Sequence, residues 1–239
     1  MDYESELISK ENIADGTMAF HFRKSEGFSF EAGQSIDLTL LNPPETDAEG
    51  NTRAFSIAAA PHEDELMIAS RMRDTAFKRV LKSADIGLKV QITGPFGSFI
   101  LHENSSRPAI MLVGGIGVTP FRSIIKEATQ KKLPHKIYLF YSNRQPKDAP
   151  FLEELKNLEK INPNFKFIPT MTDVENIDSW DGEKGYIDEK MVDKYVPDRA
   201  GAIYYSAGPQ KMVFAMRTML NTAGISNDDI RTEEFSGYH

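Results

Sequence analysis

A glycine-rich segment, Gly114–Pro120, constrains the fold of this chain more than any other feature of its sequence. It has the pattern Gly-Gly-x-Gly-x-Thr-Pro and follows a continuous apolar run, Ala109–Val113, which is typical of a parallel strand buried on both faces. Glycines let a backbone turn tightly and approach a pyrophosphate, and the N-terminus of a following helix offers free N–H groups and a positive dipole. The segment therefore predicts a strand, a phosphate-binding loop and a helix. The alternative is a glycine-rich turn without a ligand.

The chain from Ala109 onward alternates strand and helix patterns, which is typical of a doubly wound parallel sheet. Asp148 is placed to cap a helix with Pro150 in its first turn, and Pro209 opens a further helix. The expected strands are 109–113, 137–141, 165–169, 203–207 and 230–235, and the first expected helix is 120–131. This half therefore predicts a Rossmann-like domain.

The chain before residue 102 has short alternations of apolar and polar residues broken by turns, which predict antiparallel strands in a barrel or sandwich. One expected helix, Ala76–Leu81, interrupts them, and Asn42–Thr52 predicts an exposed loop. His102–Pro108 is polar and predicts a linker. We therefore expect an antiparallel β-barrel domain over residues 1–104 and a Rossmann-like parallel-sheet domain over residues 105–239.

Composition excludes several kinds of chemistry. The chain has 28 basic and 35 acidic residues and a formal net charge of −7, which argues against nucleic acid as its main partner. It has no cysteine, so these residues form no disulfide, iron–sulfur cluster, zinc ribbon or cysteine nucleophile. The five histidines show no metal-ligand spacing, and we expect no metal site. Electron transfer by these residues would need a bound organic cofactor.

The first residues are acidic, unlike the basic and apolar start of a secretory leader. No apolar run approaches the ~20 residues that span a bilayer. We therefore expect a cytoplasmic protein without a membrane span.

Three further segments carry ligand-binding patterns that are weak when taken singly. Arg53–Ser56 offers a cation for phosphate, an aromatic ring for stacking and a hydroxyl, although a surface arginine before an ordinary strand would have the same sequence. Gly94–Phe99 predicts a tight turn with an apolar plug. Ala207–Pro209 lies at the carboxyl end of a strand, where doubly wound sheets bind ligands, but it also suits a simple strand-to-helix turn.

Taken in order, these segments resemble the motifs of the ferredoxin–NADP reductase family of flavin oxidoreductases. Arg53–Ser56 is similar to the family's Arg-x-Tyr-Ser, Gly94–Phe99 to its Gly-Pro-x-Gly-x-Phe and Gly114–Pro120 to its glycine loop. Ala207–Pro209 is similar to its Cys-Gly-Pro, and Glu233–Phe235 to its C-terminal Glu-x-aromatic. The resemblance covers nearly the whole chain. It implies an N-terminal FAD-binding β-barrel and a C-terminal NAD(P)-binding domain.

The resemblance implies a flavin side in the β domain. Arg53 would hold flavin phosphate, Phe55 would lie against the isoalloxazine, and Ser56 would hydrogen-bond near flavin N5. Backbone amides at the start of the single helix would bind the pyrophosphate, which suits a helix N-terminus. Three nearby cations would neutralise phosphate or else form a solvated basic face: Arg71, Arg73 and Lys78. The set expected at the flavin is Arg53, Ala54, Phe55, Ser56, Arg71, Met72, Arg73, Thr75, Ala76, Phe77, Gly94 and Phe235.

The resemblance also implies a nucleotide side in the α/β domain. The glycine loop would receive the NAD(P)H pyrophosphate, with Thr119 close to the nicotinamide. Glu233 would lie near the reacting rings, unless it is a surface carboxylate. The expected catalytic residues are therefore Ser56, Thr119 and Glu233. The residues expected to bind the nucleotide are Gly115, Gly117, Val118, Thr119, Pro120, Ser142, Asn143, Arg144, Gly208 and Pro209.

Three positions depart from the family pattern. Phe55 replaces a tyrosine, which keeps the ring and loses a hydroxyl. Ala207 replaces a cysteine; hydride transfer needs two oriented rings rather than a thiolate, so we expect activity to survive. Four residues follow Phe235, so an aromatic shield over the flavin would be Phe235 or Tyr238.

The implied function is an FAD-dependent oxidoreductase that takes a hydride from NADH or NADPH and passes single electrons to a separate acceptor, such as a ferredoxin. Arg144 would suit a 2′-phosphate, but Asp173 would repel one and favours NADH. The alternative is an accessory flavin- or nucleotide-binding subunit of a larger redox complex. A dehydrogenase with an organic substrate is disfavoured, because its usual proton-transfer residues are absent. A group of lysines predicts a solvated face or a guide for an acidic electron carrier: Lys126, Lys131, Lys132 and Lys136.

Overall fold

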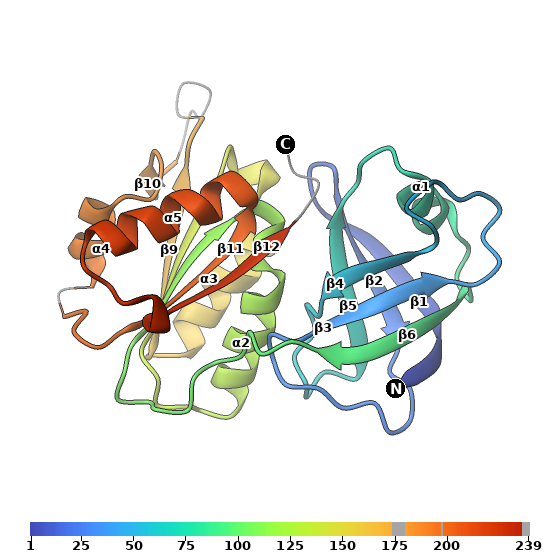
Figure 1. The fold of residues 1–239 in the computed structure, drawn as a ribbon, viewed down its shortest axis with the longest axis horizontal. Helices are drawn as coiled ribbons and strands as arrows, with labels where there is room; N and C mark the ends of the chain where they lie inside the picture. The colour runs from blue at the N-terminus through green and yellow to red at the C-terminus, as the bar shows by residue number, and fades with distance from the viewer. Residues whose placement is uncertain (174–179, 197, 236–239) are drawn as a thin grey trace.

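A computed structural model gives the structure of this chain and describes residues 1–173, 180–196 and 198–235. Two six-stranded sheets lie side by side, each with its own hydrophobic core (Figure 1). The segment 97–108, which contains no helix or strand, crosses from the first sheet to the second. The two-domain architecture is therefore confirmed, whereas the boundary after residue 104 stays a prediction.

The first sheet is antiparallel, with the strand order β4-β3-β6-β1-β2-β5. It is barrel-like because its two edge strands return to each other: the N–H of Ala58, just after β4, donates to the carbonyl of Met67 in β5 at 2.8 Å. Alternate residues of β3 point into the core, as the period-two pattern predicts. The elements are β1 (Asp2–Ala14), β2 (Thr17–Arg23), β3 (Ser35–Leu40), β4 (Thr52–Ser56), β5 (Glu65–Arg71), α1 (Ala76–Ser83) and β6 (Lys89–Phe96).

The long strand β1 is not predicted by the sequence. Leu7 is its only fully buried apolar residue, and most of its other positions carry charged or polar side chains at the surface. An apolar alternation this sparse gives no strand pattern. The strand forms because it pairs with β2 on one side and β6 on the other.

The tight turn predicted at Gly94–Phe99 is wrong for its first half. Gly94–Phe96 continues β6 and pairs with β3 through an irregular register, and a bulge of this kind is where a strand accepts a proline. The predicted apolar plug is present: the ring of Phe99 meets Phe121 edge-on at 5.4 Å and Tyr205 at 5.7 Å. This contact joins the end of the β domain to the core of the second domain.

The second sheet is parallel, with the strand order β10-β9-β8-β7-β11-β12, which confirms the predicted doubly wound sheet. Helices α2 and α3 pack on one face and α4 and α5 on the other, so every residue of β7 is buried (Figure 1). The strands are β7 (Ala109–Gly114), β8 (Ile137–Asn143), β9 (Phe165–Met171), β10 (Glu183–Lys184), β11 (Ile203–Pro209) and β12 (Ile230–Phe235). The helices are α2 (Thr119–Gln130), α3 (Leu152–Ile161), α4 (Glu189–Tyr195) and α5 (Gln210–Thr222), and the 3₁₀ turns are η1 (Gly115–Val118), η2 (Pro146–Asp148) and η4 (Asn227–Asp229).

The prediction that Asp148 caps α3 is wrong. The helix begins at Leu152, because Ala149 is extended (φ −97°, ψ 97°), as a residue before proline tends to be. Asp148 instead ends η2, where its carboxylate accepts the N–H of Gln145 at 3.2 Å. Within the described ranges, none of the helices combines the length and apolar composition needed to cross a membrane.

Candidate functional site

The junction between the domains brings Glu233 against Ser56. Strand β12 runs toward the β domain (Figure 1), and Glu233 lies near its end. Ser56 ends β4, and its Oγ donates a hydrogen bond to Oε1 of Glu233 at 3.1 Å. The other carboxylate oxygen, Oε2, is buried and has no hydrogen-bond partner among the residues that the structure describes. Residues 177 positions apart in the sequence thus form one polar pair.

Burial makes the Glu233 carboxyl a weaker acid than an exposed glutamate. It raises the pKa of the Glu233 carboxyl to about 6, and the hydrogen bond from Ser56 opposes that rise. A carboxyl with such a pKa changes its protonation state close to neutral pH. A general acid or base works best when its pKa lies in this range. A perturbed carboxyl of this kind at a junction of domains is a candidate for function.

Thr119 lies in a different environment from this pair. Its side chain is 2% exposed, and its Oγ1 donates to the carbonyl of Ile116 at 3.1 Å. The hydroxyl therefore closes the turn that leads into α2. Its predicted place beside a nicotinamide stays a prediction.

The glycine loop is the 3₁₀ turn η1, which is wedged against the end of β11. A Cβ on Gly117 would lie 2.5 Å from the carbonyl oxygen of Ala207, and a Cβ on Gly114 would collide with the sulfur of Met212. Gly115 differs, since it has a φ of +54° and a Cβ added to it would meet no atom within 4 Å. Close packing against backbone therefore requires Gly117, whereas a side chain on Gly114 would need only Met212 to move, and Gly115 is favoured by its positive φ beside open space.

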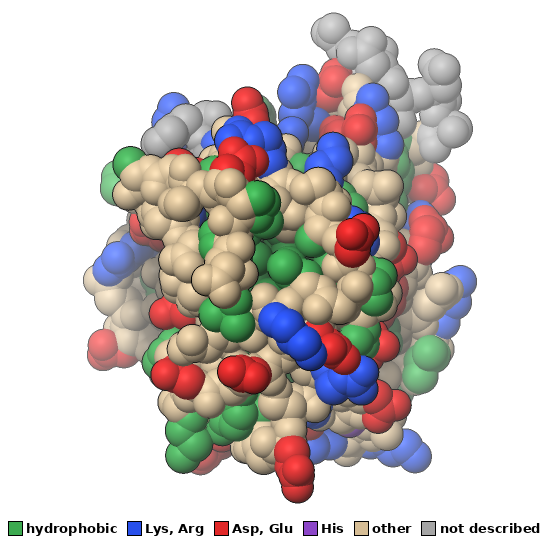
Figure 2. Space-filling view, turned by 90° about the vertical axis from the view of Figure 1, so that its right-hand side faces the viewer, with side chains coloured by type: hydrophobic (Ala, Val, Ile, Leu, Met, Phe, Trp, Pro, Cys, Tyr) green, Lys and Arg blue, Asp and Glu red, His purple; other side chains and the backbone are tan. Residues whose placement is uncertain are grey.

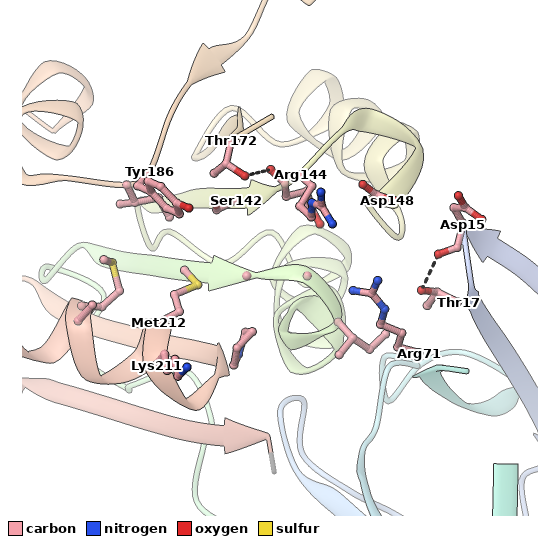
Figure 3. A pocket seen from close by; sticks show the side chains of 18 residues that line it. Asp15, Thr17, Arg71, Ser142, Arg144, Asp148, Thr172, Tyr186, Lys211 and Met212 are labelled. Atoms are coloured by element: carbon pink, nitrogen blue, oxygen red, sulfur yellow. Dashed lines mark hydrogen bonds between the residues drawn. The ribbon is translucent and has the colours of Figure 1, made fainter. Parts of the chain in front are cut away.

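A cavity of about 580 Å³ opens beside Gly115 (Figure 3). The residues predicted to bind the nucleotide that line it are Gly115, Ser142, Asn143, Arg144 and Pro209. The other loop residues, Gly117, Val118, Thr119 and Pro120, are buried behind it. The carboxyl ends of β7, β8 and β11 thus meet at one cavity, where a doubly wound sheet binds its ligand.

Charged side chains line this cavity from both domains. Arg71, at the end of β5, and Arg144, after β8, lie on opposite sides of it and turn toward its interior (Figure 3). The sequence groups Arg71 with the flavin phosphate, whereas the structure places it here. The remaining lining residues are not among those predicted to bind a cofactor; they are Asp15, Thr17, Gly114, Ile116, Asp148, Thr172, Tyr186, Ile187, Lys211, Met212, Ala215 and Met216.

Asp173, on which the preference for NADH rested, does not line the cavity. Its carboxylate accepts a hydrogen bond from Nε2 of Gln145 at 2.7 Å. The cavity wall instead carries Arg71, Arg144 and Lys211 with two acids. These side chains give no reason to prefer NADH over NADPH.

On the flavin side, Arg53 is held by its own chain. Its Nη2 lies 3.1 Å from the carboxylate of Asp47 and 3.0 Å from that of Glu49. The guanidinium also lies over the ring of Phe77 at 5.3 Å, and Phe55 packs on the same ring at 5.9 Å. The predicted flavin residues of β4 and α1 therefore form one cluster.

Asp47 also occupies the N-terminus of α1, where its Oδ2 accepts the backbone N–H of Ala76 at 3.1 Å. The Arg53 guanidinium and the start of α1, both predicted to bind flavin phosphate, thus both contact the carboxylate of Asp47. Burial and the charges of Arg73 and Arg53 lower the pKa of Lys78, which is the effect of crowded cations. This place therefore holds an anionic group, Asp47, and its predicted role in binding flavin phosphate stays a prediction.

Acidic and basic side chains lie next to each other across this end of the molecule, around a patch of hydrophobic ones (Figure 2).

Among the remaining flavin-side predictions, Met72 is partly buried against the β core and Thr75 caps α1. Phe235 is partly buried against the core of the α/β domain, and Tyr238 lies outside the described residues.

The lysine group is not a free positive surface. Lys126 lies 2.6 Å from Glu63 and 3.1 Å from Glu154, and Lys131 lies 2.7 Å from Glu127. These pairs favour a structural role for two of the four lysines. Across the described ranges, no three His, Cys, Asp or Glu side chains are placed to hold a metal ion.

Comparison with known proteins agrees with this arrangement. Residues 111–218 match the family model of the oxidoreductase NAD-binding domain. The chain is 29% identical over 237 residues to the phenol hydroxylase P5 protein of Acinetobacter pittii, and this match covers 98% of the chain. The chain spans 65% of the length of that protein.

Solved structures show the same two-domain fold. The cytochrome P450 reductase of Amycolatopsis has a TM-score of 0.83 and 24% identity, with 98% of this chain and 70% of that chain covered. The ferredoxin NADP⁺ reductase of Neisseria gonorrhoeae, with bound FAD and NADP, has a TM-score of 0.79 and 19% identity, with 98% of both chains covered. At these identities the likeness is one of fold.

Proposed function

The chain belongs to the ferredoxin–NADP reductase family, and on this premise we propose that it is an NAD(P)H-dependent FAD oxidoreductase. It takes a hydride from NADH or NADPH onto bound FAD and passes single electrons to a separate acceptor. The observation that carries this proposal is the pair formed by Ser56 and Glu233, because it joins the predicted flavin strand to the nucleotide domain at 3.1 Å.

FAD, when bound, supplies a two-electron acceptor that releases electrons one at a time. The chain supplies its binding groups: the guanidinium of Arg53 and the N–H groups at the start of α1 would hold the phosphates, where Arg53 and the N–H of Ala76 now hold Asp47. Phe55 offers its ring to the flavin plane. The hydroxyl of Ser56 would orient the edge of the flavin that faces the nucleotide domain.

The α/β domain positions the nucleotide. The open side of Gly115 admits a pyrophosphate, and Arg71 and Arg144 neutralise its charge from opposite walls. Ala207 is fully buried against the glycine loop, at the position where the family carries a cysteine. The resulting orientation of two rings is the main catalytic contribution of the chain.

Glu233 holds the proton at this junction. Its Oε1 accepts from Ser56, so in the protonated form the proton lies on Oε2, which has no other partner among the described residues. A carboxyl with a pKa of about 6 both gives and takes a proton near neutral pH. Thr119 contributes by closing the turn that holds the glycine loop.

The proposal extends to partners and boundaries. The phenol hydroxylase P5 protein and the cytochrome P450 reductase bear the names of components that serve an oxygenase, which supports a redox protein such as a ferredoxin or an oxygenase as the acceptor here. We also propose a cytoplasmic location and the domain division of residues 1–104 and 105–239.

The visible spectrum of the purified protein tests the proposal. FAD-loaded protein should be yellow, and NADH or NADPH added without air should bleach it; parallel titrations with the two nucleotides would establish which donor is used. A colourless protein that takes up no added FAD contradicts the proposal. A yellow protein that neither nucleotide bleaches supports the accessory subunit instead.

A further inference from the structure

Arg122 of α2 is buried between the two domains with its hydrogen-bonding capacity fully used. Its side chain is 7% exposed, and all five N–H bonds of its guanidinium have acceptors. Nη1 donates to the carbonyl of Ala58 at 2.6 Å and to Glu63 at 2.9 Å, and Nη2 donates to Glu63 at 3.2 Å. Nε and Nη2 donate to Glu154 at 2.7 and 2.8 Å. The arginine thus holds two carboxylates bidentately.

These acceptors come from both domains. Ala58 and Glu63 belong to the segment after β4 in the β domain, whereas Glu154 belongs to α3. Ala58 lies two residues after Ser56, and Arg122 lies three residues after Thr119. The arginine therefore links the strand that presents Ser56 to the helix that begins at the glycine loop.

Neighbouring groups make the same connection. Oγ of Ser123 donates to the carbonyl of Ala59 at 2.6 Å, and Lys126 donates to Glu63 at 2.6 Å. The N–H of Ala60 donates to Glu63 at 2.6 Å, which holds this carboxylate on its own domain. The segment after Ser56 is thereby bound to one face of α2 at several points.

The charges in this cluster balance. Arg122 and Lys126 face Glu63 and Glu154, so two cations meet two anions. Burial alone would raise the pKa of Glu63, but hydrogen bonds and charge from Arg122, with Lys126 and the N–H of Ala60, lower it to about 2. Removing one member of such a buried pair leaves a charge without compensation, so the arrangement resists displacement.

We propose that Arg122 is a positioning residue for hydride transfer, which sets the distance and angle between the Ser56 strand and the glycine loop by holding Glu63 and Ala58 against α2. The inference rests on the proposed function and adds the reason why two separately folded cofactor sites meet in a productive geometry. Transfer between two rings depends steeply on their alignment, because a shift of ~1 Å changes such rates by up to about 100-fold.

The two carboxylates of the cluster supply a matched pair of variants. Glu63→Gln removes the carboxylate charge that pairs with Arg122 across the domain junction. Glu154→Gln removes the carboxylate charge that pairs with the same guanidinium within the α/β domain. Single-turnover reduction of the FAD-loaded proteins, followed over a range of nucleotide concentrations, gives the limiting rate and the nucleotide affinity separately. FAD affinity and the thermal midpoint are measured for each variant.

We expect Glu63→Gln to lower the limiting rate of flavin reduction about tenfold, with nucleotide and FAD affinities within about twofold of wild type. We expect Glu154→Gln to keep the rate within about twofold, although both variants lose a partner of Arg122 and are less stable. An unchanged rate in Glu63→Gln overturns the inference, and so does an equal loss of rate in both variants.

Arg122→Lys provides an independent check if Glu63→Gln does not fold. It retains the charge but cannot hold two carboxylates bidentately, so it should reduce flavin more slowly than wild type at saturating nucleotide. A wild-type rate in Arg122→Lys also overturns the inference. Wild-type protein that neither nucleotide reduces contradicts the proposed function itself, and the inference falls with it.

Discussion

The cavity beside Gly115 and the N-terminus of α1 are the two places where we propose that phosphate binds, but they differ in whether the binding groups are free. At the cavity, the loop η1 presents backbone beside open space, and Arg71 and Arg144 turn inward from its walls. At α1, Asp47 already pairs with the Arg53 side chain and accepts the backbone N–H of Ala76. The cavity is open beside the glycine loop, whereas the N-terminus of α1 is occupied by a carboxylate of the chain.

This difference predicts different responses to substitution. The glycine loop should fail when a side chain is added at Gly117, because the new Cβ would overlap the backbone of β11. The site at the N-terminus of α1 should bind FAD more weakly when Arg53 is removed and more tightly when the charge of Asp47 is removed. Variants at each site therefore test whether the distinction holds.

The largest effect should follow Gly117→Ala on the nucleotide side. The new Cβ would lie 2.5 Å from the carbonyl oxygen of Ala207 and 2.7 Å from Cα of Gly208, and backbone atoms of a buried strand cannot move aside cheaply. We expect the free energy of unfolding to fall by about 3 kcal/mol, as in other overpacked cores. Denaturant unfolding of the variant checks this value.

Gly115→Ala is the matched control for Gly117→Ala. A Cβ there meets no atom within 4 Å, so its cost is the strain of a φ of +54°, about 1 kcal/mol. If both variants lose the same stability, close packing against β11 is not what requires Gly117.

The next largest effect should follow Arg53→Ala on the flavin side. The variant removes the cation predicted to hold flavin phosphate, so the FAD dissociation constant should rise about thirtyfold, or about 2 kcal/mol. Nucleotide affinity should not change, because Arg53 does not line the nucleotide cavity. Fluorescence titration of the flavin-free protein with FAD measures the first quantity.

Arg79→Ala is the control for Arg53→Ala, since Arg79 lies on α1 and forms ion pairs with Glu45 and Asp74 at the surface. Exposed pairs of this kind contribute little, so FAD affinity should stay within about twofold of wild type. Equal losses in both variants would mean that general positive charge, rather than the Arg53 guanidinium, attracts the flavin.

Glu233 lies where the two sites meet, and its titration should be visible in stability. Because folding raises its pKa from 4.5 to about 6, the folded state binds more protons than the unfolded state between these pH values. Its contribution is present below pH 4.5 and is lost as the pH rises through 6, so wild type should lose about 2 kcal/mol relative to Glu233→Gln across this window. Unfolding of flavin-free protein at a series of pH values measures it.

Glu234→Gln, one residue along and exposed, should follow wild type in the same experiment. A Glu233→Gln protein whose stability shows the wild-type pH dependence would mean that burial does not perturb this carboxyl.

The sequence places the glycine loop correctly but does not reveal the walls of the cavity beside it, and the reason is physical. A glycine loop between a buried strand and a helix is local, so Gly114–Pro120 is sufficient to place it. The walls of the cavity are not local: Arg71 comes from the other domain, and Tyr186 from a segment without a motif. The preference for NADH drawn from Asp173 does not follow from the cavity wall, because its carboxylate accepts a hydrogen bond from Gln145 and does not line the cavity.

Errors in the predicted elements have similar causes. The strand pattern of β1 is hidden because its outward residues are charged and Leu7 is its only fully buried apolar residue. The helix α3 begins later than predicted, because the proline after Ala149 keeps that residue extended. The pairing of Ser56 with Glu233 joins residues 177 positions apart, so it follows only from the family resemblance and not from local pattern.

The smallest effect, and the most direct test of the comparison, should follow Asp47→Asn. Asparagine keeps an oxygen that accepts the N–H of Ala76 but removes the charge that pairs with Arg53. A phosphate then meets the helix N-terminus and the guanidinium without displacing a charged competitor. We expect FAD to bind about fivefold more tightly, or about 1 kcal/mol, since charges near a helix N-terminus contribute on this scale.

Glu45→Gln separates this effect from a general loss of negative charge. Glu45 lies two residues from Asp47 and pairs with Arg79, so its neutralisation reduces the charge of the same loop while leaving Arg53 and Ala76 engaged. FAD affinity should then stay at the wild-type value. If Asp47→Asn binds FAD no more tightly than wild type, Asp47 supports the site rather than filling it, and the two phosphate sites differ only in the source of their donors.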